Sequence, residues 1–162
     1  MAQSLVTTLD MLLKELRRRQ LTLGFGESCT GGLLSGTLAR IPGVSDLFMG
    51  SLVTYSYAAK VDLLGVSWET LQSFGAVSEE VVREMSQGVC HRLKVGCSIA
   101  ITGIAGPSGG TPEKPVGTVW FAVKGPDFEV AEKQVFQGER QAIQDLSVEF
   151  GLDLLLKQLK TF

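Results

Sequence analysis

A short glycine-rich segment places a serine where a predicted strand gives way to a helix. Residues 26–32 read Gly-Glu-Ser-Cys-Thr-Gly-Gly, and the serine is Ser28. Backbone amides at the start of a helix can hold a phosphate, or the oxyanion that develops on an attacked carbonyl. We therefore predict that Ser28 is a nucleophile and that Thr30, Gly31 and Gly32 bind oxyanion or substrate. A helix cap followed by a tight turn would fit the same residues.

A serine nucleophile needs a neighbouring group that accepts its proton. Histidine is the usual helper, but His91 is the only histidine, and its neighbours place it on the polar side of a predicted helix. Tyr55 ends the next predicted strand, Lys60 lies in the helix that follows it, and these two residues are the alternative. Burial lowers the pKa of a lysine, and a nearby ammonium favours the phenolate, so the pair could relay protons to and from Ser28. The same two residues would also fit a half-buried strand aromatic and a solvated helix charge.

A long irregular stretch, residues 102–115, follows another predicted strand. Loops of this length in compact domains are usually functional or disordered. Its glycines can form an anion-binding nest. The residues that we predict to bind substrate there are Thr102, Gly103, Gly106, Gly109 and Gly110. Arg140, at the start of the last predicted helix, is either a phosphate ligand or an ordinary surface charge.

Several classes of protein are disfavoured by composition. The three cysteines, Cys29, Cys90 and Cys97, show no CxxC spacing, and together with a lone histidine they predict neither a metal site nor a disulfide framework. A formal net charge of -2 argues against nucleic acid as a partner. No apolar run approaches the roughly 20 residues of a membrane span, and the first 20 residues do not resemble a leader peptide, so we expect a cytoplasmic chain.

The elements that position these residues alternate between helical and strand periodicity. The pattern predicts helices at 1–20, 33–41, 58–64, 67–74, 78–93 and 139–160, and strands at 21–27, 48–55, 97–102, 117–124 and 129–136. In the last helix Leu146 is expected on the core side, and Gly151 is expected to weaken the middle. Strands alternating with helices predict one α/β domain over residues 1–162, and the hairpin at 117–136 makes its sheet mixed. Ligands of such sheets bind beyond the carboxyl ends of the strands, so the three loops are expected to converge.

Taken together, the motifs resemble the CinA C-terminal domain family. The resemblance covers nearly the whole chain and rests on ordered blocks at residues 27–32, 53–56 with 59–60, 75–79, 102–107 and 113–120. It implies a three-layer α/β/α sandwich with a mixed, mostly parallel sheet of about five strands. It also implies that this chain is the stand-alone form of a domain that often follows a larger one, and that homo-oligomers are possible.

The resemblance also implies an activity. Members of the family are nicotinamide-nucleotide amidohydrolases, which convert nicotinamide mononucleotide and water to nicotinate mononucleotide and ammonia in pyridine-nucleotide salvage, without metal or cofactor. The family's catalytic serine, tyrosine and lysine fall on Ser28, Tyr55 and Lys60. The loop from Thr102 and the arginine at Arg140 would help to hold the ribose phosphate.

Two departures from the family's pattern lie beside the predicted catalytic residues. Tyr57 and Ala58 stand where Asn-Glu is usual, and Met49 stands where an arginine is common. These changes leave a second interpretation open, in which the chain is a catalytically weak or inactive nucleotide-binding module, a sensor or a competence- or damage-associated protein.

Overall fold

The computed structural model describes residues 3–162, and in them strands and helices alternate much as the sequence pattern predicts. The helices are α1 (Gln3–Arg19), α2 (Leu33–Ala39), α3 (Tyr57–Leu64), α4 (Trp68–Phe74), α5 (Glu79–Leu93) and α6 (Arg140–Thr161). The strands are β1 (Leu23–Glu27), β2 (Phe48–Val53), β3 (Cys97–Gly103), β4 (Thr118–Lys124) and β5 (Glu129–Val135). None of these helices is both long and apolar enough to cross a membrane.

The strands of the described residues form a single five-stranded sheet in the order β2-β1-β3-β4-β5. Strand β1 pairs in parallel with both β2 and β3, whereas β4 pairs antiparallel with β3 and with β5. All strands except β4 therefore run in one direction, so their carboxyl ends meet at one edge. The chain leaves β1 toward β2 on one side, while β3 lies on the other side, which makes the β1–β3 boundary the topological switch point where ligands of open α/β sheets bind.

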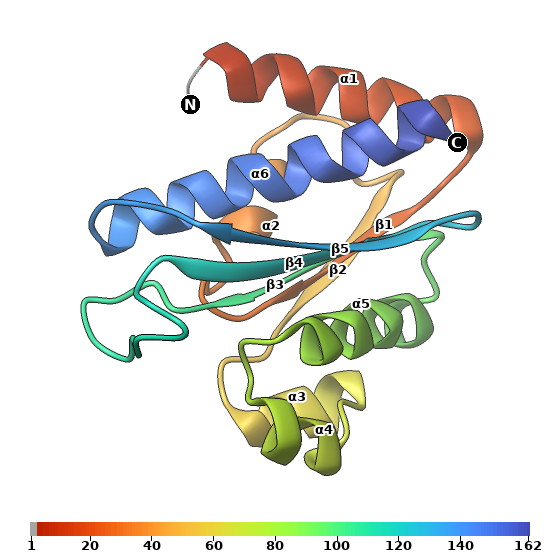
Figure 1. Cartoon of the computed structure of the whole chain (residues 1–162). Coiled ribbons are helices and arrows are strands. Elements are labelled where there is room, and N and C mark those ends of the chain that lie inside the picture. Colours follow the sequence, from red (N-terminus) through yellow and green to blue (C-terminus); the bar gives the residue numbers. More distant parts are fainter. Residues whose placement is uncertain (1–2) are drawn as a thin grey trace.

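Helices cover both faces of the sheet, as Figure 1 shows: α1, α2 and α6 lie on one face, and α3, α4 and α5 lie on the other. Each face has its own apolar core, and the buried leucine stripe of α1, Leu5, Leu9, Leu12, Leu13 and Leu16, belongs to the first. The arrangement confirms the predicted three-layer α/β/α sandwich with a mixed, mostly parallel sheet.

One expectation about α6 was wrong, and the structure gives Gly151 a role that the sequence did not predict. Leu146 is 38% exposed and does not belong to the core. Gly151 is buried against β3 and β4, and a Cβ built there would lie 3.3 Å from the side chains of both Ile99 and Ile101. The glycine therefore lets the helix approach the sheet closely, a tertiary requirement that helix propensity alone does not reveal.

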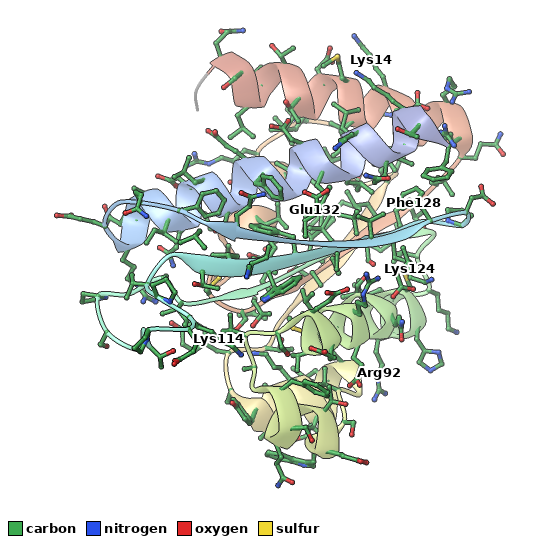
Figure 2. The ribbon with its side chains drawn as sticks, viewed as in Figure 1. Lys14, Arg92, Lys114, Lys124, Phe128 and Glu132 are labelled. Atoms are coloured by element: carbon green, nitrogen blue, oxygen red, sulfur yellow. The ribbon has the colours of Figure 1, made fainter. Side chains whose placement is uncertain are left out.

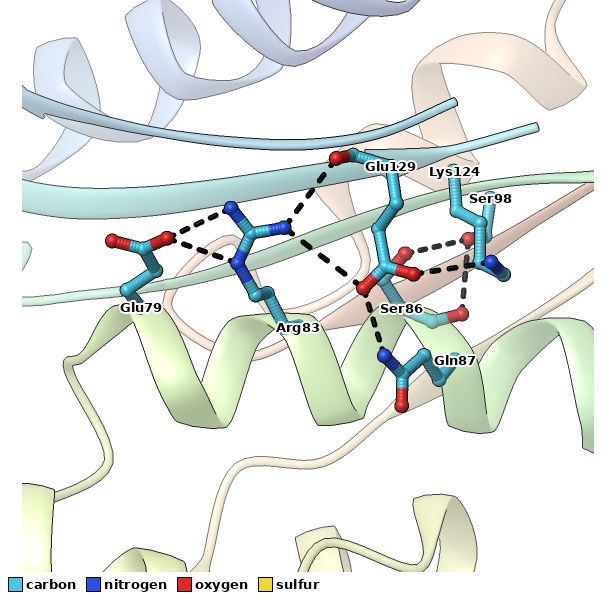
Figure 3. A network of polar contacts seen from close by, with 7 residues as sticks. All are labelled: Glu79, Arg83, Ser86, Gln87, Ser98, Lys124 and Glu129. Atoms are coloured by element: carbon cyan, nitrogen blue, oxygen red, sulfur yellow. Dashed lines mark hydrogen bonds and ion pairs between the residues drawn. The ribbon is translucent and has the colours of Figure 1, made fainter. Parts of the chain in front are cut away.

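A polar network ties α5 to the β4–β5 hairpin (Figure 3). The Glu129 carboxylate accepts hydrogen bonds from Gln87 and Lys124, and Arg83 lies between Glu79 and Glu129. Burial raises the pKa of Glu129, but the hydrogen bonds from Gln87 and Lys124 outweigh that effect and lower the pKa overall. The network fixes the hairpin to α5 on the face away from α6.

Candidate active site

A cavity of about 270 Å³ opens at the carboxyl edge of the sheet, beside the switch point. It brings together most of the residues that the sequence predicts for the site: Ser28, Tyr55, Lys60, Thr102, Gly103, Gly106, Gly109 and Arg140. Cys29, Ala76, Val77, Ile104, Ala105 and Ser108 complete its wall. Thr30, Gly31, Gly32 and Gly110 do not line it, although all four were predicted to bind oxyanion or substrate.

Lys60 contacts the predicted nucleophile directly. Its Nζ donates to Ser28 Oγ at 2.9 Å and to the carbonyl oxygen of Thr54 at 2.7 Å. Ser56 begins α3 as its N-cap, with its hydroxyl accepting from the amide of Ala59, and this start places Lys60 in the first turn of the helix. The side chain of Lys60 is almost completely buried, as is Ser28.

Burial sets the protonation states of the two groups nearest Ser28. It lowers the pKa of Lys60 from 10.5 to about 8, because the ammonium loses its hydration in the protein interior. It raises the pKa of the Cys29 thiol to about 12, although Lys60 and Arg140 act in the opposite direction. Near neutral pH a fraction of Lys60 is therefore free to accept a proton, whereas Cys29 stays a thiol and is not a nucleophile.

Glu27, the last residue of β1, organises the turn that follows it. The carboxylate is fully buried and accepts from Thr30 Oγ1 at 2.8 Å and from Ser51 Oγ at 2.9 Å. It also accepts from the amides at the start of α2, those of Gly32, Leu34 and Ser35. An acidic side chain thus occupies the positive end of α2, where a bound anion would otherwise lie.

The expected oxyanion-binding role of Gly31 and Gly32 needs correction for this reason. The Gly32 amide donates to Glu27, and the Gly31 amide donates to the carbonyl oxygen of Ser28 at 3.0 Å. Both glycines instead supply positive φ angles, 58° and 102°, that bend the chain into α2. Among the hydrogen bonds of residues 3–162, the amides of Cys29 and Thr30 have no acceptor, which leaves them available to a ligand.

Tyr55 does not pair with Lys60 as the sequence suggested. Its hydroxyl accepts from Arg140 Nη2 at 2.6 Å, and the tyrosine is 61% exposed at the mouth of the cavity. Arg140 donates through its other terminal nitrogen to the carbonyl oxygen of Gly106 at 2.7 Å. The sequence could not show this contact, because it joins the first residue of α6 to a residue of the segment after β2, 85 positions earlier.

The long loop after β3 forms one wall of the cavity. Thr102 is buried, and its hydroxyl donates to the carbonyl oxygen of Ala76 at 2.9 Å. Gly106 and Gly109 have positive φ angles of 78° and 93°. Gly110 has a different role, because a Cβ there would lie 2.7 Å from the backbone nitrogen of Val116, so this glycine allows the loop to close on itself.

The opposite wall, at Ala76 and Val77, is held by two further side chains. Lys114 extends from the long loop, as Figure 2 shows, and its Nζ donates to the carbonyl oxygens of Phe74 and Val77. The Tyr57 hydroxyl accepts from the amide of Ala76 at 3.2 Å. Tyr57 therefore supports the wall from outside, and neither it nor Ala58 lines the cavity.

Sequence analysis missed two contributors to the site. No role was predicted for Glu27, although an acid that ends an otherwise apolar strand is a signal that could have identified it. Gln144, in α6, donates from Nε2 to the carbonyl oxygen of Cys29 at 2.8 Å. No local pattern marks this glutamine, because its partner lies 115 residues away. Within residues 3–162, no group of three or more His, Cys, Asp or Glu side chains is arranged to hold a metal ion.

The fold and the cavity together define an α/β domain with a buried serine–lysine pair at the switch point of its sheet. The model of the CinA C-terminal domain matches residues 6–159. The chain therefore belongs to the CinA C-terminal domain family.

Relatives and solved structures agree with this assignment. A CinA-like protein of Fervidobacterium nodosum is 48% identical over 146 residues, which are 90% of this chain and 36% of that protein. The nicotinamide-nucleotide amidohydrolase PncC of Enterobacter agglomerans is 49% identical over 133 residues, 82% of this chain and 81% of that protein. The competence/damage inducible protein CihA of Agrobacterium tumefaciens is 34% identical, with a TM-score of 0.94 over 99% of this chain and 98% of that one.

Relatives of two sizes thus occur. The chain spans between a third and two fifths of the length of the first CinA-like relatives, at 36% and 38%, whereas it matches most of the amidohydrolase.

Proposed function

We propose that this chain is an amidohydrolase that converts nicotinamide mononucleotide and water to nicotinate mononucleotide and ammonia, with Ser28 as the nucleophile. The observation that carries the proposal is the buried contact of 2.9 Å between Lys60 Nζ and Ser28 Oγ. A serine becomes an effective nucleophile when an adjacent base removes its proton. The similarity to the relative named as a nicotinamide-nucleotide amidohydrolase supports the choice of substrate.

In the acylation step, Ser28 Oγ attacks the carboxamide carbon while its proton passes to neutral Lys60. The amides of Cys29 and Thr30 stabilise the oxyanion that forms on the carboxamide oxygen. Lys60 then returns the proton to the amide nitrogen, the carbon–nitrogen bond breaks, and ammonia leaves an ester on Ser28. Because Lys60 touches Ser28 and Tyr55 does not, Lys60 is the immediate base in this proposal.

In the deacylation step, water takes the place of the departed ammonia and gives a proton to Lys60 as it attacks the ester carbon. The second tetrahedral intermediate collapses, the ester bond breaks, and the proton on Lys60 returns to Ser28 Oγ. The acid leaves, and the serine–lysine pair is restored. Each step requires a single group that both accepts and donates a proton, which a lysine with a pKa of about 8 can supply at physiological pH.

The charge of the cavity supports an anionic substrate. Lys60 and Arg140 line it, and none of its lining residues is an Asp or Glu. Arg140 has no carboxylate partner among the ion pairs of the described residues. We assign the substrate phosphate to the Arg140 side of the cavity, with Tyr55 and the loop glycines Gly106 and Gly109 beside it.

Ammonia release from the mononucleotide, measured without added metal, tests the proposal. The wild type should release ammonia, and Ser28→Ala should lower kcat at least about a thousandfold, because the covalent route is lost. Retention of the wild-type rate by Ser28→Ala would remove Ser28 as the nucleophile.

The alternative is a nucleotide-binding module without turnover. This alternative rests on Tyr57 and Ala58, which depart from the family's pattern. Neither residue lines the cavity, so the geometry of the site does not favour the alternative. Saturable binding of the mononucleotide by the wild type with no ammonia formed would favour this alternative over hydrolysis.

A further inference from the structure

Helix α6 contacts the nucleophile turn through Gln144, whose side-chain amide donates to the carbonyl oxygen of Cys29. Gln144 is half-buried and lies one helical turn after Arg140, so both side chains leave the same face of α6. One helix therefore holds the mouth of the cavity through Arg140 and the turn behind Ser28 through Gln144.

The carbonyl that Gln144 holds belongs to the same peptide group as the Thr30 amide. In a trans peptide the C=O and N–H bonds point in opposite directions, and the only cis peptide of the described residues is Gly106-Pro107. Cys29 lines the cavity and Gln144 does not. A carbonyl fixed toward α6 therefore turns the Thr30 N–H away from α6, and this N–H has no acceptor among the hydrogen bonds of the described residues.

A second side chain fixes the other end of this residue pair. The Thr30 hydroxyl donates to the buried carboxylate of Glu27. Gln144 donates to the Cys29 carbonyl oxygen and Glu27 accepts from the Thr30 hydroxyl. These two hydrogen bonds fix the orientation of the peptide group between Cys29 and Thr30 before substrate binds. Preorganised donors of this kind account for a large share of transition-state stabilisation, since they need no reorganisation during the reaction.

We propose that Gln144 is a positioning residue that aims the Thr30 amide at the oxyanion formed on the carbon attacked by Ser28. This inference rests on the proposed function only in taking Ser28 as the nucleophile; it does not depend on which amide is hydrolysed. Gln144→Met removes the donor at nearly constant side-chain length. Gln141→Met is the matched control, since Gln141 is exposed in the same helix and makes no side-chain hydrogen bond in the described residues.

The readout is the rate at which a fluorophosphonate probe labels Ser28. Ser28 Oγ attacks phosphorus, the P–F bond breaks, fluoride leaves, and the serine proton passes to Lys60, so the developing charge on the phosphoryl oxygen needs the same amides. Gln144→Met should be labelled roughly tenfold to a hundredfold more slowly than the wild type, and Gln141→Met at the wild-type rate. In the amide assay kcat should fall while KM stays within about twofold, because the interaction is made in the transition state.

Thermal unfolding of each variant separates positioning from loss of fold. If Gln144→Met does not fold, Gln144→Asn takes its place, because its shorter side chain keeps the polar group but does not reach Cys29. Labelling of a folded Gln144 variant at the wild-type rate would overturn the inference, and so would an unlabelled Ser28 in the wild type. Normal labelling of the wild type without ammonia release would instead refute the proposed function and leave the role of Gln144 standing.

Discussion

Lys60 is a lysine whose surroundings differ sharply from those of a lysine in water. Its ammonium is buried between a serine hydroxyl and the Thr54 carbonyl, and no carboxylate lies within ion-pair distance of it in the described residues. Desolvation without a compensating charge favours the neutral amine. We propose that this preference allows Lys60 to act as a base toward Ser28.

The pH dependence of the rate should report this preference. With the pKa of Lys60 lowered to about 8, kcat/KM should rise roughly tenfold per pH unit below pH 8 and level off above it. A profile measured from pH 6 to 9.5, with unfolding checked at each end, is the relevant measurement. A rate independent of pH between 6 and 8 would argue against Lys60 as the base.

Stability should respond to the same group. Below about pH 8 Lys60 is charged in both the folded and the unfolded protein, so the folded protein bears the full free-energy cost of burying the charge. From about pH 8 to 10.5 the folded state has lost the proton while the unfolded state keeps it, so stability should rise with pH, by up to about 3 kcal/mol in total.

Comparison with Lys60→Met isolates this effect. Cys29 and Cys97 act in the opposite sense above about pH 9, because burial raises the pKa of each to about 12, but both remain in the variant. The free energy of unfolding of wild type minus that of Lys60→Met, from urea titrations at several pH values, should increase between pH 8 and 10. A constant difference would mean that the pKa of Lys60 is not lowered.

Residue chemistry could be predicted from the sequence only in part. Ser28 and Lys60 were identifiable because each follows a predicted strand, and parallel strands end at one edge of a sheet. The contacts of Glu27, Gln144 and Arg140 could not be predicted from the sequence, since each contact depends on which helix or loop packs beside the residue.

Among the elements, α3 is the one whose placement decides the geometry of the serine–lysine pair. It packs against α5 at Gly88, where a Cβ would lie 2.0 Å from the backbone oxygen of Leu64. A contact with backbone cannot be relieved by a side-chain rotation. Gly88 is therefore a requirement for the close approach of the helix that carries Lys60.

Gly88→Ala should displace α3, destabilise the fold by about 2 to 4 kcal/mol and lower kcat more than tenfold. Gly36→Ala is the matched control, because a Cβ at Gly36 in α2 meets no atom within 4 Å; it should be neutral or stabilising by up to about 1 kcal/mol. Urea unfolding and the ammonia assay on both variants make the comparison. A Gly88→Ala variant as stable and active as the wild type would show that α3 is not held by this contact.

Element boundaries were largely predictable, because caps and periodicity are local. Ser56, Ser67 and Ser78 each accept from an amide of the helix that they begin, and the hairpin follows from two strand patterns joined at Gly125-Pro126. The exposure of Leu146 and the burial of Gly151 were not predictable, since they depend on how α6 crosses the sheet.

At the scale of the whole molecule, strand order gathers the site. Segments from β1, β2, β3 and α6 meet because of the strand order and the strand directions. Strand β1 lies between β2 and β3, and β5, which precedes α6, runs in the same direction as these three strands. Periodicity predicts which residues form strands but not which strands are neighbours, so the strand order could not be predicted from the sequence. From this assembly we propose that Ser28, activated by Lys60, forms a covalent ester with the acyl group of the mononucleotide.

Acid quench during turnover, followed by mass spectrometry of the peptide that contains Ser28, tests this claim most directly. The account predicts a mass increase equal to the mononucleotide minus ammonia on Ser28 of the wild type, and no such adduct in Ser28→Ala. An adduct on another residue, or ammonia released by Ser28→Ala at the wild-type rate, would contradict it.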